Sequence, residues 1–91
     1  QTWKLLKETL VEQGGRLQVE DENYLAAIFV SSVFGFVDDL EIRFDAQQNL
    51  FHIRSASRVG HSDFGINRKR VERLKKRLRE KLSDQRLSNY P

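Results

Sequence analysis

The chain has 91 residues, a net charge of +3, 38% hydrophobic and 32% charged residues, and no cysteine. A chain of this length buries one compact core, so we expect a single domain. The lack of thiols excludes disulfides and thiolate metal sites. The longest apolar run, YLAAIFV at residues 24–30, is much shorter than the roughly 20 residues that a membrane-spanning helix requires.

Positive charge is concentrated toward the C-terminal end. Residues 68–86 hold ten Lys or Arg against three acidic residues, a surplus of seven, so the remaining residues must sum to −4. Nucleic-acid binding favours cations interleaved with aromatic residues. This segment contains no aromatic residue, so nucleic acid is not the expected partner. Its narrow apolar stripe also differs from that of a membrane-surface helix. We interpret the segment as a packed helix with a solvated basic face.

The first predicted element is a helix that starts near residue 2. Trp3, Leu6 and Leu10 recur at helical spacing and form one apolar face. Gly14 and Gly15 follow and supply a C-terminal stop, because glycine adopts the left-handed cap conformation without strain.

Four strands are predicted next. RLQVE, at residues 16–20, alternates and should place Leu17 and Val19 on one side. YLAAIFVSSVF, at residues 24–34, is apolar on both faces, which favours a central strand covered at least partly on each side. A protein partner, or an N-terminal segment missing from this chain, would cover the second face.

The last two strands, FVDDLEIRF at residues 36–44 and LFHIRS at residues 50–55, have a predictable register. Their apolar faces must coincide, and a slip by one residue would turn every side chain to the other face. One register satisfies this condition and also gives a favourable charge pair on the outer face. Its pairs are Phe44–Phe51, Ile42–Ile53 and Glu41–Arg54.

A long helix is predicted at the end of the chain. Asn67 suits the N-cap position, and Ile66 with Val71 would form a hydrophobic staple. We therefore predict an α+β fold, in which a four-stranded antiparallel sheet carries an N-terminal helix and a long C-terminal helix on one face. One apolar stripe at helical spacing would pack the long helix against the sheet; it comprises Val71, Leu74, Leu78 and Leu82.

Asp38 is expected to point inward, because strand parity places it on the face of Leu40 and Ile42. An inward carboxylate must be paired or hydrogen-bonded. The preferred interpretation is a structural clasp that fixes the following loop to the sheet, and the alternative is a pocket carboxylate. The residues of the predicted clasp are Asp38, Ser55, Ser57 and Arg58.

Three cations, Arg68, Lys69 and Arg70, occupy the first turn of the long helix, where the helix dipole favours anions. Either they pair with acidic residues of the body such as Asp38, Asp39 or Glu41, which we favour, or they help bind an external anion beside free backbone N–H groups. The residues of this hypothetical weak anion site are Arg58, Arg68, Arg70 and Asn67.

The loop at residues 55–63 contains the residue types of a hydrolase: Ser55, Ser57, His61, Ser62 and Asp63. Neighbours in one loop rarely converge on one another, whereas such residues often close turns. We therefore prefer a non-catalytic binding or accessory domain and keep a small hydrolase-like enzyme as the alternative. No catalytic residue and no cofactor is assigned.

A metal site is not expected either. Only two histidines are present, and Asp38 and Asp39 point to opposite faces of a strand, where they cannot chelate one ion together.

Two stretches, FGFVDDLEIRF at residues 34–44 and IRSASRVGHSDFGINRKRVERL at residues 53–74, resemble the signature of the domain of unknown function 1499 family of bacteria, cyanobacteria and plant plastids. The resemblance extends from about Trp3 to Leu78. It implies that a further segment precedes this region, so residues 1–91 would form one domain without its N-terminal part. It also implies an exported or plastid-targeted full-length protein, but no substrate, cofactor or catalytic residue.

Overall fold

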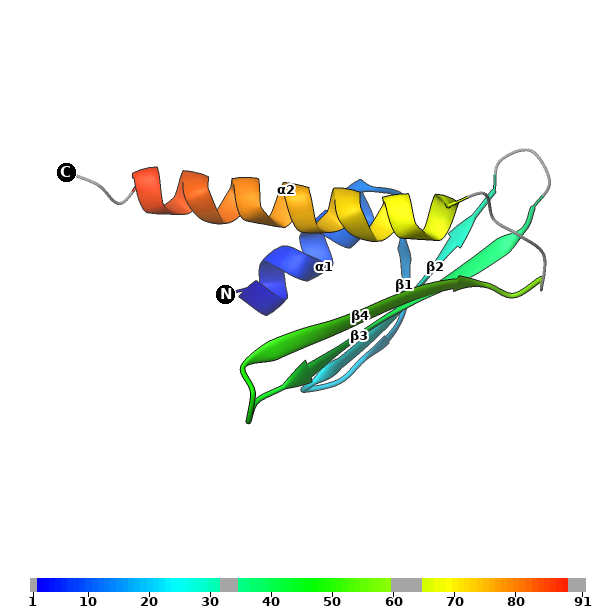
Figure 1. Ribbon diagram of the computed structural model, residues 1–91, viewed down its shortest axis with the longest axis horizontal. Helices are drawn as coiled ribbons and strands as arrows, with labels where there is room; N and C mark the ends of the chain where they lie inside the picture. The colour runs from blue at the N-terminus through cyan, green and yellow to red at the C-terminus, as the bar shows by residue number, and fades with distance from the viewer. Residues whose placement is uncertain (1, 32–34, 60–64, 89–91) are drawn as a thin grey trace.

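The computed structural model describes residues 2–31, 35–59 and 65–88, and Figure 1 shows how their elements are arranged. The strands follow one another as an antiparallel meander in the order β1-β2-β3-β4, and both helices lie on one face of this sheet. The predicted α+β fold is confirmed. In chain order the elements are α1 (Thr2–Glu12), β1 (Arg16–Glu20), β2 (Tyr24–Val30), β3 (Val37–Asp45), β4 (Leu50–Ser57) and α2 (Ile66–Ser88).

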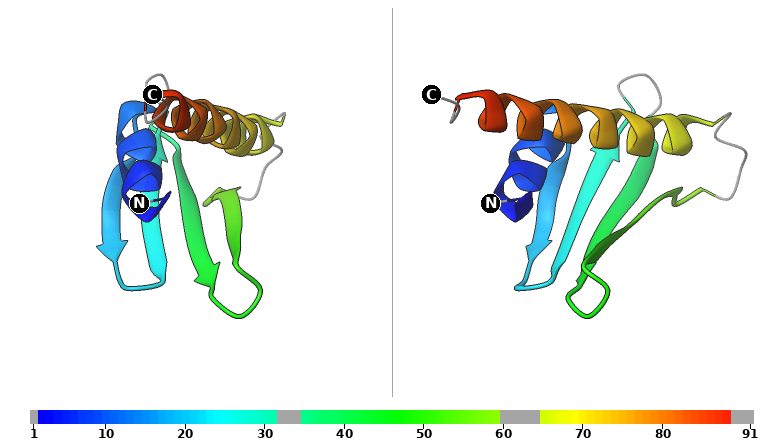
Figure 2. Two further views of the ribbon diagram at one scale, coloured as in Figure 1. Left: turned by 90° about the vertical axis from the view of Figure 1, so that its left-hand side faces the viewer. Right: turned by 60° about the vertical axis from the view of Figure 1, so that its left-hand side comes forward.

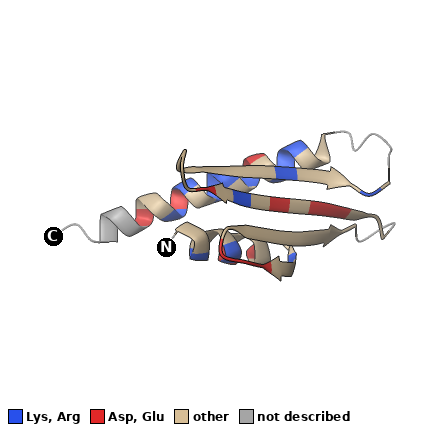
Figure 3. Cartoon of the chain, turned by 90° about the horizontal axis from the view of Figure 1, so that it is seen from below, with Lys and Arg blue, Asp and Glu red and all other residues tan. Residues whose placement is uncertain are grey.

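The two helices play different parts in the helical layer. α2 packs against α1 and β4, and α1 also packs against β1. Figure 2 shows that α2 crosses above the sheet and extends past it toward the C-terminus. No described element covers the opposite face of the sheet, which Figure 3 shows from below. Among the described helices, none combines the length and the apolar composition needed to cross a membrane.

The core lies between the sheet and the helices. Leu74 of α2 is fully buried there, and Leu78 packs against the core while remaining partly exposed. Val71 and Leu82 are also partly buried, so the predicted stripe faces inward. The core cluster consists of Leu6, Leu10, Leu25, Ala27, Phe29, Leu40, Ile42 and Leu74.

The register between β3 and β4 is the predicted one. Both members of each apolar pair lie on the helix-facing side, and the Glu41–Arg54 pair lies on the outer side, because side chains alternate along both strands. The observed pairs include Phe44–Phe51, Ile42–Ile53, Glu41–Arg54 and Asp38–Ser57.

The prediction for β1 is wrong in one respect. Leu17 pairs with Ala27 of the core face, but Val19 pairs with Ala26 of the outer face and is 42% exposed. An irregularity between these two positions accounts for the change, because one extra residue, Gln18, reverses the alternation of the strand.

The glycine pair ends α1 as predicted. Gly14 has a left-handed φ of 95°, and its N–H donates to the carbonyl of Val11 at 3.0 Å. The N–H of Gly15 donates to the carbonyl of Leu10 at 2.8 Å. Together these two bonds form a Schellman motif.

The start of α2 differs from the prediction. The helix begins at Ile66, and the carbonyl of Gly65 accepts a bond from the N–H of Lys69 at 2.9 Å. Asn67 therefore lies within the first turn instead of at the N-cap. Because Ile66 is itself helical, it does not occupy the staple position. The side chain of Asn67 is turned toward the sheet, where it takes part in the candidate site.

Candidate functional site

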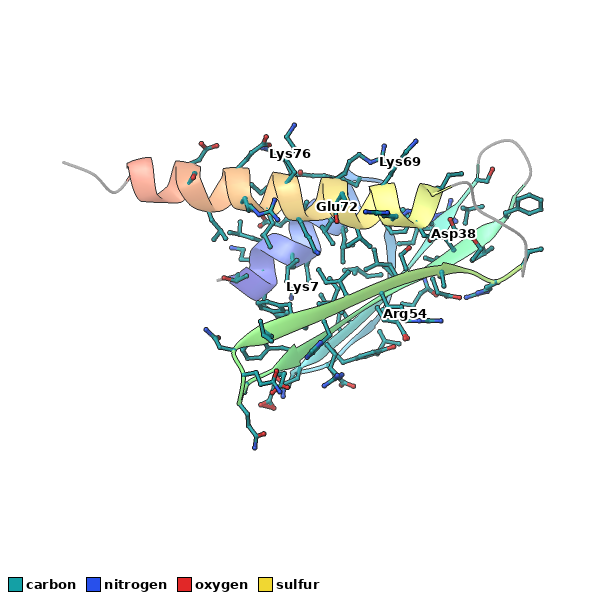
Figure 4. The ribbon with its side chains drawn as sticks, in the orientation of Figure 1. Lys7, Asp38, Arg54, Lys69, Glu72 and Lys76 are labelled. Atoms are coloured by element: carbon teal, nitrogen blue, oxygen red, sulfur yellow. The ribbon has the colours of Figure 1, made fainter. Side chains whose placement is uncertain are left out.

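The start of β3, the end of β4 and the first turn of α2 meet at one end of the sheet. Strand parity turns Asp38, Ser55 and Ser57 toward the helix layer. Residues three apart share one face of a helix, so Asn67 and Arg70 both face these strands. We call these five residues the joint. Figure 4 shows Asp38 beneath the start of α2.

Arg70 is the centre of the joint. Its Nη1 lies 2.9 Å from Oδ2 of Asp38, and the two side chains are only 12% and 14% exposed. The same nitrogen donates to Oδ1 of Asn67 at 2.8 Å and to Oγ of Ser55 at 3.2 Å. The guanidinium carbon lies 4.5 Å from the centroid of the Phe29 ring, a cation–π contact. Charge pairing and ring stacking thus hold Arg70 in one position.

Asn67 links the helix to both serines of β4. Oγ of Ser55 donates to Oδ1 of Asn67 at 2.5 Å, and Nδ2 of Asn67 donates to Oγ of Ser57 at 3.0 Å. Within the described part of the chain, no buried side-chain nitrogen or oxygen lacks a hydrogen-bond partner. A buried polar network in which every member is satisfied holds its elements in one arrangement.

Asp39 and Arg58 pair on the other face of the sheet. Nε of Arg58 donates to Oδ2 of Asp39 at 2.8 Å, and Nη2 donates to Oδ1 at 2.9 Å. These hydrogen bonds lower the pKa of the Asp39 carboxyl and raise the pKa of the Arg58 guanidinium. The Arg58 side chain is 57% exposed. Arg58 was expected beside Asp38, but Arg70 takes that place, because the two consecutive aspartates point to opposite faces.

The outer face of α2 carries cations that make no ion pair with any described residue. By contrast, two cations nearer the C-terminal end of α2 contact α1. Nζ of Lys81 lies 2.8 Å from Oε2 of Glu12, and Nε of Arg77 lies 3.8 Å from Oε1 of Glu12. Lys69 and Lys76 point away from the body in Figure 4. We call the outer group the basic face; it consists of Arg68, Lys69, Arg73, Lys75, Lys76 and Arg79, all exposed.

The predicted hydrolytic set is only partly visible. His61, Ser62 and Asp63 lie outside the described residues. Ser55 and Ser57 are described, and their hydroxyls bond to side chains of α2. The described ranges contain no group of three or more His, Asp or Glu side chains placed to hold a metal ion.

Aromatic rings anchor the opposite end of the sheet. The ring of Trp3 stacks on Phe51 with centroids 5.7 Å apart, and Phe44 lies 4.8 Å from Phe51. This cluster borders an open concavity of about 380 Å³, rimmed by Glu22 and other polar side chains. The aromatic cluster fixes the start of α1 to β4, at the end of the strands that lies away from the joint.

Sequence reasoning favoured pairing of the three first-turn cations with acidic residues of the body, and Arg70 makes such a pair with Asp38. Arg68 and Lys69 make none with a described residue, and a usable signal for this difference was present. Asn67 and Arg70 are three residues apart and so share a helix face, and Asp38 and Ser55 share the inner strand face. Combining the two periodicities would have directed Arg70 toward Asp38.

The family model described as "Protein of unknown function (DUF1499)" matches residues 1–78. This match confirms the resemblance inferred from the two sequence stretches. No curated protein and no solved structure matches the chain significantly.

Proposed function

The chain belongs to the DUF1499 family of proteins of unknown function, and we propose that it is a non-catalytic binding domain that holds an anionic partner on the basic face of α2. The supporting observation is the division of cations around this helix. Arg70, Arg77 and Lys81 face the body and pair with its carboxylates. The outward cations have no such partners among the described residues.

The basic face concentrates charge along a short length of helix. Its six cations are accompanied by two exposed acidic residues, Glu72 and Glu80, which leaves a net charge of +4 over these eight side chains. Such a concentration produces a local positive potential and increases the encounter rate with anions, most strongly at low salt. An anionic partner would also relieve the mutual repulsion of these side chains.

The weak anion site at the start of α2 belongs to this proposal in a modified form. Arg68 is exposed and adjoins Lys69, so these two cations are its main contacts. Arg70 and Asn67 face the sheet and bond to the joint. Arg58 is engaged by Asp39, whose carboxylate offsets its charge, so Arg58 contributes less to the attraction of an anion.

We further propose that the joint acts as a structural clasp. Its ion pair is largely shielded from solvent, and its hydrogen bonds connect α2 with β3 and β4. A hydrolytic role for Ser55 or Ser57 would require its hydroxyl to give up these bonds to α2. The satisfied network therefore favours the clasp over the hydrolase-like alternative.

Titration with inorganic polyphosphate, followed by amide chemical shifts at low salt, tests the binding proposal. We expect saturable amide shifts along residues 65–80 at low salt. Binding should weaken as the salt concentration rises to about 0.1 M, where screening acts over about 10 Å. The Lys75→Gln/Lys76→Gln variant should bind more weakly. Lys4→Gln, which removes an exposed cation of α1, is the matched control. Absence of saturable shifts, or an equal loss in the control, would contradict the proposal.

A further inference from the structure

Four exposed apolar side chains gather at the end of the molecule that contains the joint. Figures 1 and 2 show that β2 ends, β3 begins, β4 ends and α2 begins at this end. We call these residues the apolar tip; they are Val30, Phe36, Val59 and Ile66, which are 41%, 50%, 40% and 48% exposed.

Backbone pairing brings three members of the apolar tip to the same end of the sheet. Val30 pairs with Val37 at the start of β3, and the carbonyl of Val37 accepts a bond from the N–H of Arg58 at 3.0 Å. Phe36 directly precedes β3, and Val59 directly follows Arg58 beyond the end of β4, so both lie next to this pair along the backbone. Several solvent-exposed apolar side chains at one end of a molecule mark an interaction surface more often than a single one does.

Cations flank the apolar tip. Arg68 and Lys69 follow Ile66 by two and three residues in the exposed first turn of α2, and neither has an ion-pair partner among the described residues. The nearby carboxylates of Asp38 and Asp39 are already neutralised by arginines. The surface thus combines apolar side chains with uncompensated positive charge.

We propose that the anionic partner is a lipid bilayer with anionic headgroups, and that the apolar tip docks on it. This inference rests on the proposed function, because it names the partner of the same basic face. The apolar side chains enter the interfacial region, while Arg68 and Lys69 meet headgroup phosphates. Peripheral binding of this kind combines apolar burial with electrostatic attraction.

One observation favours a bilayer over a soluble polyanion. A soluble polyanion would satisfy the cations but leave the apolar tip in water, whereas a bilayer provides for both. α2 itself does not insert, because Leu74 and Leu78 are used in the packing against the sheet. The contact is therefore confined to the tip and the first turns of α2.

Co-sedimentation with vesicles tests this inference on the intact chain. We expect binding to equimolar phosphatidylcholine–phosphatidylglycerol vesicles and little binding to pure phosphatidylcholine. In Arg68→Gln/Lys69→Gln, the loss of each cation should lower the partition coefficient about five-fold. Phe36→Ser/Ile66→Ser should lower it by about ten-fold or more. The matched control is Val11→Ser/Leu50→Ser, which removes equally exposed apolar side chains elsewhere.

Moving the single tryptophan provides a second readout. Trp3 lies at the opposite end of the strands, so its emission in the parent chain should not shift on adding anionic vesicles. In Trp3→Phe/Phe36→Trp the emission should shift to the blue, and brominated lipids should quench it. If Phe36→Ser/Ile66→Ser fails to fold, Val59→Ser carries the same comparison with only one exposed side chain changed.

The outcomes separate the two proposals. Binding to polyphosphate without binding to vesicles would overturn the bilayer inference and leave the anion-binding function in place. Vesicle binding that survives loss of the apolar tip would also overturn it, because charge alone would then suffice. Self-association abolished by Phe36→Ser would assign the tip to a second copy of the chain. Failure to bind both probes would overturn the proposed function itself.

Discussion

Nη1 of Arg70 and Oδ2 of Asp38 lie 2.9 Å apart, and both side chains are largely withdrawn from solvent. The pair joins α2 to β3, two elements far apart in sequence. Removing one member of a shielded ion pair leaves the other charge uncompensated, which destabilises a protein more than losing an exposed pair does. We therefore expect the orientation of α2 above the sheet to depend on this contact.

Substitution of Asp38 should destabilise the fold strongly. Asp38→Ala leaves Arg70 without its carboxylate, so we expect the free energy of unfolding to fall by about 3–5 kcal/mol, as for other broken buried pairs. Urea denaturation measures this change. Asp39→Ala is the matched control, because it removes the neighbouring carboxylate, which is paired on the exposed face. Equal stability of the two variants would contradict the clasp.

The pKa of Asp39 should depend on Arg58. In the parent chain the hydrogen bonds from Arg58 hold the pKa of the Asp39 carboxyl below its ordinary value. In Arg58→Gln this pKa should rise toward that of an unpaired aspartate, as followed by carboxyl ¹³C shifts. Glu12, whose pKa Lys81 lowers, is an internal control that should not change.

The sign of the resulting pH effect follows from linkage. A carboxyl with a lowered pKa in the folded state contributes stability above its unfolded pKa, and this contribution is lost as the pH falls through the folded pKa. Arg58→Gln should therefore reduce the stability difference between neutral and acidic pH. An unchanged acid dependence would show that the pair contributes nothing to stability.

Leu74 should be the most sensitive position of the α2 stripe. Because it is fully buried, Leu74→Ala should cost roughly 2–5 kcal/mol of unfolding free energy. Leu78→Ala should cost less, since Leu78 is only partly buried. Thermal and urea unfolding provide the measurements, and Lys75→Ala serves as an exposed control on the same helix. A larger effect at Leu78 than at Leu74 would show that α2 is placed differently.

A side chain at Gly15 should destabilise the fold. A Cβ there would lie 2.9 Å from the carbonyl oxygen of Leu10 and 2.9 Å from Cζ of Phe29. The Leu10 oxygen belongs to the helix backbone and the Phe29 ring packs against Arg70, so neither contact can relax freely. Gly15→Ala should cost roughly 1–3 kcal/mol.

Gly14→Ala provides the comparison for Gly15. A Cβ at Gly14 meets nothing within 4 Å, so only the left-handed backbone opposes it, at about 1–2 kcal/mol. Urea unfolding of both variants separates steric overlap from backbone strain. A Gly15→Ala variant as stable as the parent would contradict the close packing of α1 against Phe29.

The elements and the register of β3 with β4 were accessible from sequence because they follow from local periodicity. Two alternating strands with one apolar face each have one alignment that keeps both faces together, and Ile42 pairs with Ile53 for this reason. Helical spacing likewise identified Leu74 and Leu78 as inward residues. The end of α1 was predictable from sequence because Gly14 and Gly15 have a local conformational role.

The irregularity at Gln18 was decided by tertiary structure. RLQVE alternates regularly in sequence, yet Val19 faces outward because β1 departs from simple pairing with β2. A bulge depends on how a strand fits its neighbour, and that fit has no signature in five residues.

The charge partners were decided in the same way. Periodicity determined that Asp38 points inward and Asp39 outward, but several arginines of equal charge were available to each. Arg70 reaches Asp38 in a helix placed above the sheet by tertiary packing, with Leu74, one turn further along α2, buried in the core. Which cations remain on the basic face was settled by that same placement, since an ion pair requires contact within a few ångströms and sequence parity specifies only a direction.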